Sequence, residues 1–513
     1  DQEGRQFRAG VYRPLDEAAL APAADDARFP ARGHGPPFLV CHEVPRVPRV
    51  RHLVGPSVIA LGMGLGAGEF LLWPNLIAVN GFSIWWLFWI GVLTQFVAIV
   101  EIERWTIATG ESVFAGMARL DRLAFWPWFF LVATLVSFFW PGWASQSAEF
   151  TGEILRGVTG ATIAWQPLAL LMLAVIWMAL AVSTIVYNAL ERFQIGLVLV
   201  FFPLLAVSLL AVGVLPADVL ALLEGAVSIG RAPPALLTGE QFPTLLIAVA
   251  YAGSGGTLLL AQSLWLRDKG FGMAAYQGRI AGIRGCNEEV SRTGYVFDPL
   301  SSPVGLARFR TWMAVARREL LLTFVLLILL SVVITTLVVS TTLGTGRADL
   351  AGNLSAMVAE QAEVMARTAG RWLELAFLLG GAFVLFSTQL GIFEALVRNF
   401  TDASHATSSR LRRLLEGDPR RFYYPFMLVV LAVIAGALHL ALPTELVRIS
   451  ANMSNFGALM FPFALMYLNS RLPRAARPRP GHYVILSLNV LFFGFFFVNF
   501  AYEFFVGEAL VQF

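Results

Sequence analysis

The sequence predicts an all-α membrane protein of about eleven transmembrane helices, arranged as two inverted repeats of five helices and one C-terminal helix. Three observations lead to this prediction: an apolar composition, eleven apolar stretches that can each cross a bilayer, and two glycine-rich interruptions placed five stretches apart. Of the 513 residues, 57% are hydrophobic and 14% are charged, and the mean hydropathy is +0.69. These values are typical of an integral membrane protein and exclude an ordinary soluble domain.

A helix needs about 20 consecutive apolar residues to cross the hydrocarbon core of a bilayer. Stretches of this kind cover residues 53–79, 83–108, 124–149, 166–187, 193–214, 243–266, 318–343, 373–397, 422–442, 447–469 and 482–507. An odd number of spans fits two repeats of five plus one extra helix. The predicted parts are a tail at 1–50, a first repeat at 51–214, a second repeat at 243–469 and a last span at 482–507.

Basic side chains gather in the loops after spans 6, 8 and 10. The loop at 267–317 contains Arg267, Lys269, Arg279, Arg284, Arg292, Arg308 and Arg310. The segment at 215–242, by contrast, contains one arginine. Because loops rich in Lys and Arg stay on the cytoplasmic side, we expect a multi-pass protein of the cell's inner (plasma) membrane with a cytoplasmic N-terminus and an external C-terminus. Both cysteines, Cys41 and Cys286, then lie on the reducing side, and two cannot form a disulfide framework.

Glycines interrupt spans 1 and 6. Residues 62–68 contain four glycines and residues 251–257 contain three. Each glycine costs a helix interior roughly 1 kcal/mol relative to alanine, so such clusters unwind a helix locally. In a bilayer, unwound backbone is tolerated only where it lines a cavity or is buried in protein, and paired broken helices mark the substrate site of many transporters. We therefore expect non-helical backbone near 64–68 and 253–256.

Spans 1 and 6 are the first helices of the two predicted repeats, so the two breaks occupy equivalent places. This agreement predicts a LeuT-like architecture, in which the two repeats have inverted topology. The alternative is that the glycines only allow close packing of helices, as small residues do in many membrane proteins.

Two loops are long enough to hold structure of their own. The external segment at 344–372 is either a solvated linker or a short helix that Asp349 caps and that runs to Arg371. The cytoplasmic loop at 267–317 either folds against the N-terminal tail or a partner protein, or is a flexible linker.

Five short strings fall in order on the predicted spans: Gly55–Ala60, Ile107–Gly110, Ala148–Gly152, Leu190–Arg192 and Phe461–Leu465. Through these strings, most of residues 51–470 resembles the Nramp family of proton-coupled divalent-metal transporters. The resemblance implies a LeuT-like fold and secondary transport of a metal ion.

The resemblance fails at the family's metal site. In span 1, Gly66 falls on the family's metal-binding Asp and Glu69 falls on an Asn. In span 6, Leu260 falls on the metal-binding Met and Gln262 falls on a His. In span 3, Gln146 falls on the Asp of the proton route and Glu149 on its Glu. A thioether is a soft ligand that helps a site to prefer transition metals. Because Leu260 offers none, we do not expect a Mn or Fe site of the family type.

Oxygen ligands remain near the two breaks, and oxygen suits a hard cation such as Mg²⁺. The predicted substrate-binding residues are Gly66, Glu69, Ser254, Thr257, Leu260, Gln262 and Ser454, with Asn452 and Asn455 as further oxygen donors. A divalent cation here is cargo, and no resident cofactor is expected.

Glu69 is the central candidate, because a carboxylate inside a span is costly and functional by default. It can bind a cation, carry a proton or recognise an amine. The alternative is a structural carboxylate that accepts hydrogen bonds from the unwound backbone of span 6.

Other charged residues near the spans are expected to form pairs. The resemblance implies that Glu149 pairs with Arg420 or Arg421, and the predicted proton-coupling set is Glu69, Glu149 and Arg421. Glu394 and Arg398 are spaced to pair on one helix face. Near the inner end of span 2, Glu101, Glu103 and Arg104 are expected at the membrane interface.

The first function that the sequence predicts is a secondary transporter of a hard divalent cation working by alternating access, with proton coupling as an option. The alternatives are a transporter of a small amino-acid-like solute, and a non-transporting membrane subunit that docks a protein partner through its tail and the loop at 267–317. The sequence contains no histidine cluster, nucleophile elbow or Walker loop, so we expect neither an enzyme nor a nucleic-acid-binding protein.

Overall fold

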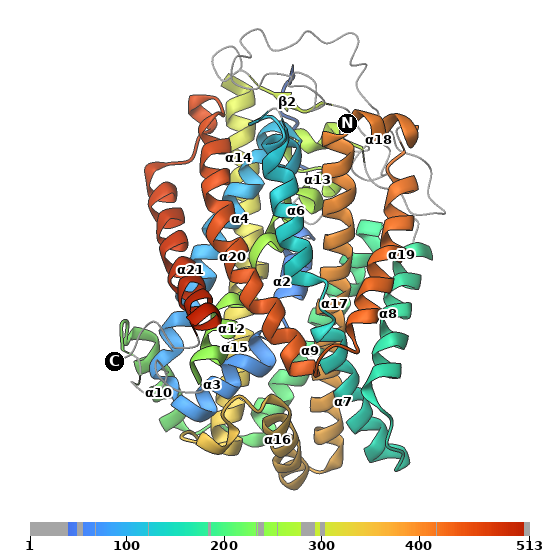
Figure 1. Cartoon of the computed structure of the whole chain (residues 1–513). Coiled ribbons are helices and arrows are strands. Elements are labelled where there is room, and N and C mark those ends of the chain that lie inside the picture. Colours follow the sequence, from blue (N-terminus) through green and yellow to red (C-terminus); the bar gives the residue numbers. More distant parts are fainter. Residues whose placement is uncertain are drawn as a thin grey trace.

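Long helices lying side by side form almost the whole structure (Figure 1). The computed structural model of the protein describes residues 39–48, 55–66, 68–121, 123–182, 186–231, 233, 241–253, 255–278, 293–297, 303–416 and 418–506. Within these ranges the only strands are two of two residues each, β1 (Val40–Cys41) and β2 (Tyr295–Val296). The all-α prediction is therefore confirmed.

The first half of the chain begins with a broken helix. Its elements are α2 (Pro56–Gly64), the π-helix η3 (Gly68–Leu72), α3 (Trp73–Asn80), the 3-10 turn η4 (Phe82–Ile84), α4 (Trp85–Thr109), α5 (Val113–Met117), α6 (Phe125–Phe138), α7 (Gly142–Thr159), α8 (Trp165–Val182), α9 (Val186–Val212) and α10 (Pro216–Val227).

The second half begins with another broken helix. Its elements are α12 (Gln241–Ala250), the 3-10 helix η5 (Gly256–Ala261), α13 (Gln262–Lys269), η6 (Gly272–Tyr276), α14 (Pro303–Leu320), the π-turn η7 (Leu321–Val325), α15 (Leu326–Leu343), η8 (Ala348–Leu350), α16 (Leu354–Ala369), α17 (Arg371–Thr407), α18 (Ser409–Leu414), α19 (Arg420–Ala437), α20 (Pro443–Ser470), η9 (Arg474–Ala476) and α21 (Pro480–Val506).

Each of the eleven expected spans falls on a helix or a broken helix of the structure. By length and hydropathy, eight of the described helical segments can cross a membrane, and the bent pair of α2 with η3–α3 makes a ninth. The two remaining expected spans are the broken helix α12–α13 and the helix α20. The protein is thus a multi-pass membrane protein, and the number of eleven stays a prediction.

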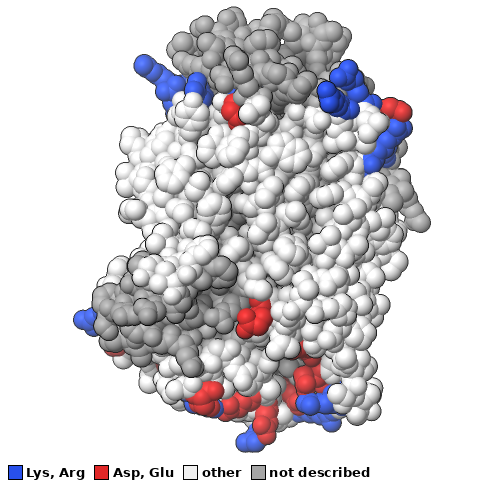
Figure 2. Space-filling view, viewed as in Figure 1, with Lys and Arg blue, Asp and Glu red and all other residues white. Residues whose placement is uncertain are grey.

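The two ends of the bundle differ in charge. We call the end that carries β1, β2 and α18 the arginine-rich end (Figure 1). On the face shown in Figure 2, Lys and Arg side chains lie around this end, whereas most of the wall between the two ends is uncharged. An uncharged wall is what a lipid-facing surface requires. By the positive-inside rule, the arginine-rich end is the expected cytoplasmic side.

The tail and the long loop lie together at the arginine-rich end. Strands β1 and β2 pair in parallel, with Val40 opposite Tyr295 and Cys41 opposite Val296. Next to this pair, the indole N–H of Trp312 on α14 donates to the Pro45 carbonyl at 2.9 Å. The described part of the loop therefore folds against the tail, so the flexible-linker alternative is wrong for these residues.

A helix does occupy the segment at 344–372, but Asp349 does not cap it. Helix α16 begins at Leu354, and the Asn353 side chain accepts a hydrogen bond from the backbone N–H of Ala356 at 3.1 Å. Asp349 instead accepts hydrogen bonds from Arg347 at 2.7 and 3.0 Å, and these bonds lower the pKa of its carboxyl. Asp349 therefore pairs with Arg347 and does not cap the helix, and Asn353 is the cap residue.

Candidate functional site

Both glycine clusters interrupt their helices where the sequence predicts. Helix α2 ends at Gly64, and the chain resumes at Gly68 as a π-helix whose axis with α3 is bent by 42° from α2. Helix α12 ends at Ala250, and the chain resumes at Gly256 as a 3-10 helix. The expected unwinding is confirmed for the described residues of both segments.

The two breaks pack directly against each other. A Cβ atom added at Gly64 would lie 2.8 Å from the carbonyl oxygen of Gly253, and one added at Gly68 would lie 2.7 Å from that of Tyr251. Contacts this short exclude any side chain larger than hydrogen. The glycines therefore do both things that the sequence left open, because they unwind the helices and they let the unwound backbones touch.

Neighbouring helices satisfy the backbone groups that the first break leaves open. The Thr388 hydroxyl on α17 donates to the carbonyl of Leu65 at 2.7 Å, and the Thr335 hydroxyl on α15 donates to the carbonyl of Glu69 at 2.8 Å. Unpaired backbone groups are costly in a bilayer. The two hydroxyls therefore replace the backbone N–H donors that a continuous helix would supply to these carbonyls.

A small cavity lies where the breaks cross. Its lining combines glycine backbone with the side chains of Met63, Phe138, Trp143, Tyr251 and Leu258. The free space is about that of one water molecule. In this conformation the crossing is closed around an ion-sized space.

Glu69 lies next to the first break and is 1% exposed. One oxygen, Oε2, accepts from the backbone N–H of Gly66 at 3.3 Å, within the first break. The other oxygen, Oε1, has no hydrogen-bond partner among the described residues. One buried oxygen therefore stays available for a proton or a cation.

Of the other predicted binding residues, three lie at the breaks. Thr257 and Ser454 lie at the second break: the Thr257 hydroxyl accepts from Thr134 on α6 at 2.7 Å, and Ser454 Oγ lies against Gly255 and Gly256. Gly66 contacts Thr388 at the first break.

The remaining predicted binding residues have other surroundings. Leu260 is part of the apolar core, and Gln262 at the start of α13 donates to Glu103 at 2.9 Å. Ser254 and the Asn452 side chain lie outside the described part, and Asn455 donates to the Leu246 carbonyl at 3.1 Å.

The expected pair between Glu149 and Arg420 or Arg421 is wrong. Glu149 on α7 accepts a hydrogen bond from Ser355 on α16 at 3.4 Å, at the end opposite the arginine-rich end (Figure 1). Arg421 pairs with Glu416 at 2.9 Å, and Arg420 with Asp418 at 2.9 Å, both beside the start of α19. Helices α7 and α19 therefore place these charges at opposite ends of the bundle.

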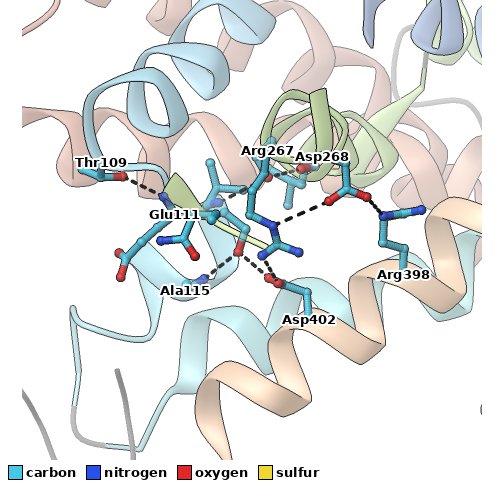
Figure 3. Close-up of polar contacts among 12 residues, drawn as sticks. Thr109, Glu111, Ala115, Arg267, Asp268, Arg398 and Asp402 are labelled. Carbon is cyan, nitrogen blue, oxygen red and sulfur yellow. Dashed lines mark hydrogen bonds and ion pairs between the residues drawn. The ribbon is translucent and has the colours of Figure 1, made fainter. Parts of the chain in front are cut away.

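The pair between Glu394 and Arg398 is confirmed and belongs to a larger buried cluster. Arg398 on α17 forms ion pairs with Glu394 and with Asp268 on α13, and all three side chains are fully buried. A second ion pair joins the same two helices, between Arg267 and Asp402 (Figure 3). The cluster fastens α13 to α17 near the arginine-rich end.

Replacing Arg398 with methionine is expected to destabilise the folded protein by about 3–5 kcal/mol, because the change leaves Glu394 buried without a basic partner and leaves Asp268 with Arg267 alone, at 3.9 Å. Thermal unfolding in detergent measures the loss. The matched control is Arg367→Met, which removes an exposed pair with Glu363 and should change stability by at most about 0.5 kcal/mol. Equal melting temperatures for the two variants would contradict this assignment.

Two buried acids were not recognised as site residues from the sequence. Glu103 on α4 is 1% exposed, and Glu319 on α14 is 8% exposed. Glu101 and Arg104 are also buried and pair with each other at 2.8 Å, and their place at the membrane interface stays a prediction. A signal was present: neither Glu103 nor Glu319 has a basic residue three or four positions away along its helix.

Glu319 caps the first half-helix from another part of the chain. Its carboxylate accepts from the backbone N–H of Gly55 at 3.2 Å and from the Ser57 hydroxyl. A negative charge at a helix N-terminus is stabilised by the free N–H groups and the helix dipole. Helix α14 thereby fixes the position where α2 begins.

The broken first helices of the two halves, meeting at a closed crossing, define a class: multi-pass membrane proteins of LeuT-like fold.

Two solved structures of one transporter agree with this fold, and a third solved structure is similar at a lower score. A single-residue variant of the Eremococcus coleocola manganese transporter is similar over 92% of both chains, with a TM-score of 0.57 and 11% identity. The same transporter in complex with an aromatic bis-isothiourea substituted compound is similar over 89% of this chain and 88% of its own, with a TM-score of 0.56 and 11% identity. Mhp1, a nucleobase-cation-symport-1 family transporter in a closed conformation with bromovinylhydantoin bound, is 13% identical over 92% of both chains with a TM-score of 0.49.

Identities this low concern the fold and not the cargo. No family model matches the sequence, and no curated protein matches it. The Nramp family therefore stays a prediction.

Proposed function

We propose that the protein is a secondary transporter that carries a small cation across the inner membrane by alternating access, with the cargo held where the two broken helices cross. The observation that carries this proposal is Glu69. Its carboxylate is buried at the first break and keeps one oxygen without a partner among the described residues. A buried carboxylate without a basic partner requires a proton or a cation to offset its charge.

Alternating access requires one side of the crossing to close while the other opens. In this structure, the Arg398 and Arg267 ion pairs tie α13 to α17 on the arginine-rich side. Helix α13 is the second half of a broken helix, so breaking these pairs would free it to move. We assign the cluster as the closed gate on the cytoplasmic side.

The opposite end carries a wide acidic cavity between α7, α16 and α17. Its lining contains five carboxylates and one arginine, namely Glu149, Glu153, Glu360, Glu363, Glu374 and Arg156. Clefts lined by one sign of charge raise the local concentration of oppositely charged solutes. Three of the five carboxylates pair with arginines, namely Glu153 with Arg156, Glu360 with Arg347 and Glu363 with Arg367. Glu149 and Glu374 leave the cavity acidic, which favours a cation that arrives from the external side.

The donor set favours a hard cation over a transition metal. Leu260 replaces the soft ligand with an alkyl group, and no group of three His, Cys, Asp or Glu side chains among the described residues is arranged to hold a metal. A cation such as Mg²⁺ accepts one carboxylate together with carbonyl oxygens and waters. Glu69 would be the one charged ligand.

A small organic solute is the second candidate, because three aromatic side chains line the crossing. Phe138, Trp143 and Tyr251 offer an apolar surface of the kind that binds solutes, and Glu69 would take an amine. The free space at the crossing, about that of one water molecule, is too small for such a solute in this conformation.

A screen in proteoliposomes tests the proposal across Mg²⁺, Ca²⁺, Mn²⁺, Fe²⁺ and amino acids. We expect saturable uptake of Mg²⁺ that excess Mn²⁺ does not inhibit, because the site lacks the soft ligand. Uptake of an amino acid alone would replace the cation with the second candidate. The absence of any uptake by folded protein, together with stable capture of a protein partner, would instead support a non-transporting subunit.

Mn²⁺ and Fe²⁺ are expected to bind weakly to the purified protein, since Gly66 and Leu260 stand at the two metal-ligand positions of the resembling family. Isothermal calorimetry measures this binding directly. Micromolar Mn²⁺ affinity that persists in Glu69→Ala would contradict both the aligned positions and the hard-cation assignment.

A further inference from the structure

Glu103 is a further buried acid, and it lies against the start of α13. It lies on α4, and one of its oxygens, Oε1, accepts from the side-chain amide of Gln262 at 2.9 Å. Its other oxygen, Oε2, and the amide oxygen of Gln262 are both buried without a hydrogen-bond partner among the described residues. Glu103 is 1% exposed and Gln262 is 0% exposed.

The position of Gln262 links this acid to a movable element. Gln262 is the first residue of α13, directly after the 3-10 helix η5 of the second break. Its hydrogen bond to Glu103 therefore joins α13 to α4 at the point where the broken helix resumes. Any swing of α13 away from α4 would break this bond and would leave the carboxyl facing the space that α13 vacates.

Among the residues that the structure describes, no basic side chain forms an ion pair with Glu103. The charged group that acts on it from a packed helix is Glu319 on α14, whose like charge disfavours a second carboxylate. Lys269 on α13 pairs with Glu191 on α9 at 2.6 Å. On α4 itself, Glu101 is held by Arg104 at 2.8 Å and by His482 on α21 at 2.5 Å. A buried carboxylate beside another acid is stable only when a proton or a cation neutralises it.

We propose that Glu103 is a proton-binding residue of the transport cycle, protonated at Oε2 while α13 is packed against α4 and deprotonated when α13 moves away. When α13 moves, the O–H bond of the carboxylic acid breaks, the proton passes to water on the arginine-rich side, and the hydrated carboxylate remains. This inference rests on the proposed function, since it assigns the coupling ion of the transporter.

A proton fits this place better than a metal ion. Glu103 and Gln262 provide two unpartnered oxygens, whereas Mg²⁺ takes six ligands and Ca²⁺ six to eight. A proton needs only one oxygen. Protonation also turns the unpartnered Oε2 atom into a hydroxyl donor. The amide oxygen of Gln262 can accept a hydrogen bond from this hydroxyl after the amide rotates.

Infrared difference spectroscopy on the full-length protein tests the proton directly, without transport. At neutral pH, exposed carboxyls are ionised, so a protonated acid gives a separate carbonyl band. We expect Glu103→Gln to remove one component of that band. The matched control is Glu111→Gln, because Glu111 is buried but paired with Arg119 at 2.5 Å and should not contribute to the band.

A second variant covers the case in which Glu103→Gln does not fold. Gln262→Leu keeps the acid but removes its hydrogen bond, and it should shift the same component to higher frequency. An unchanged band in both variants, or loss of the component in Glu111→Gln, would overturn the proposal.

Transport measurements separate this inference from the proposed function. If the protein carries a cation but its band does not respond to either variant, the transporter stands and Glu103 carries no proton. If the component is lost as expected, uptake by Glu103→Gln should lose the pH dependence that the wild-type protein shows. Loss of the component with unaltered pH dependence would show a protonated residue outside the cycle and would also overturn the proposal.

Discussion

Replacing Glu69 with glutamine is expected to lower cation uptake by about 100-fold or more while the protein stays folded, because the change removes the charged ligand and keeps the size of the side chain. The amide retains one oxygen that can accept from the backbone N–H of Gly66, so the contact within the first break survives in part. Uptake into proteoliposomes and a melting curve in detergent together measure this result.

The control for this change is Glu224→Gln, an exposed residue on α10 that lies outside the crossing. Wild-type uptake in the Glu69 variant, at every pH tested, would remove Glu69 from the cation site. It would leave the carboxylate in a structural role at the first break. The organic solute would then be the stronger candidate, provided that the cargo lacks an amine.

Gly256→Ala is expected to destabilise the folded protein by about 3 kcal/mol or more, through a strained backbone and a steric clash. Gly256 has a φ of +59°, and an added Cβ atom would lie 2.7 Å from the carbonyl oxygen of Ser454. This oxygen belongs to the backbone of α20, so it cannot move aside by rotation of a side chain. A thermal shift in detergent measures the loss of stability, and uptake should fall with it because the second break can no longer keep its shape.

Gly196→Ala is the matched control for this clash. Gly196 lies in the middle of α9, and no heavy atom within 4 Å would meet its Cβ atom. Alanine there should therefore raise stability by about 1 kcal/mol, the difference in helix propensity. If both glycine variants melt at the wild-type temperature, the close contact between the second break and α20 is not present.

The sequence predicts the broken helices well because their cause is local. Glycine clusters at 62–68 and 251–257 weaken their own helices, and no distant residue is needed to infer the break. The spans follow for a similar reason, since a bilayer requires a run of apolar residues of fixed length. The cap of α16 was wrong by four residues because Asp349 and Asn353 are both good cap residues, and only the position of Arg347 decides between them.

The site was harder to predict because its partners are distant in sequence. Gln262 and Glu103 are 159 residues apart, and Ser57 and Glu319 are 262 apart. Periodicity reports neighbours within one helix and says nothing about which helix packs across from it. The false pair of Glu149 with Arg421 arose because it was carried over from a resemblance, whereas the order of the spans already places the two residues at opposite ends.

The cap on α2 has a consequence for how the chain is made. The N–H of Gly55 is satisfied by a carboxylate that the ribosome adds 264 residues later, on the first long helix after the second break. While the first repeat is being synthesised, the Gly55 N–H at the start of α2 does not yet have Glu319 as its acceptor. The native arrangement of the first broken helix is therefore reached only after α14 has been inserted, so the two repeats cannot mature one after the other as independent units.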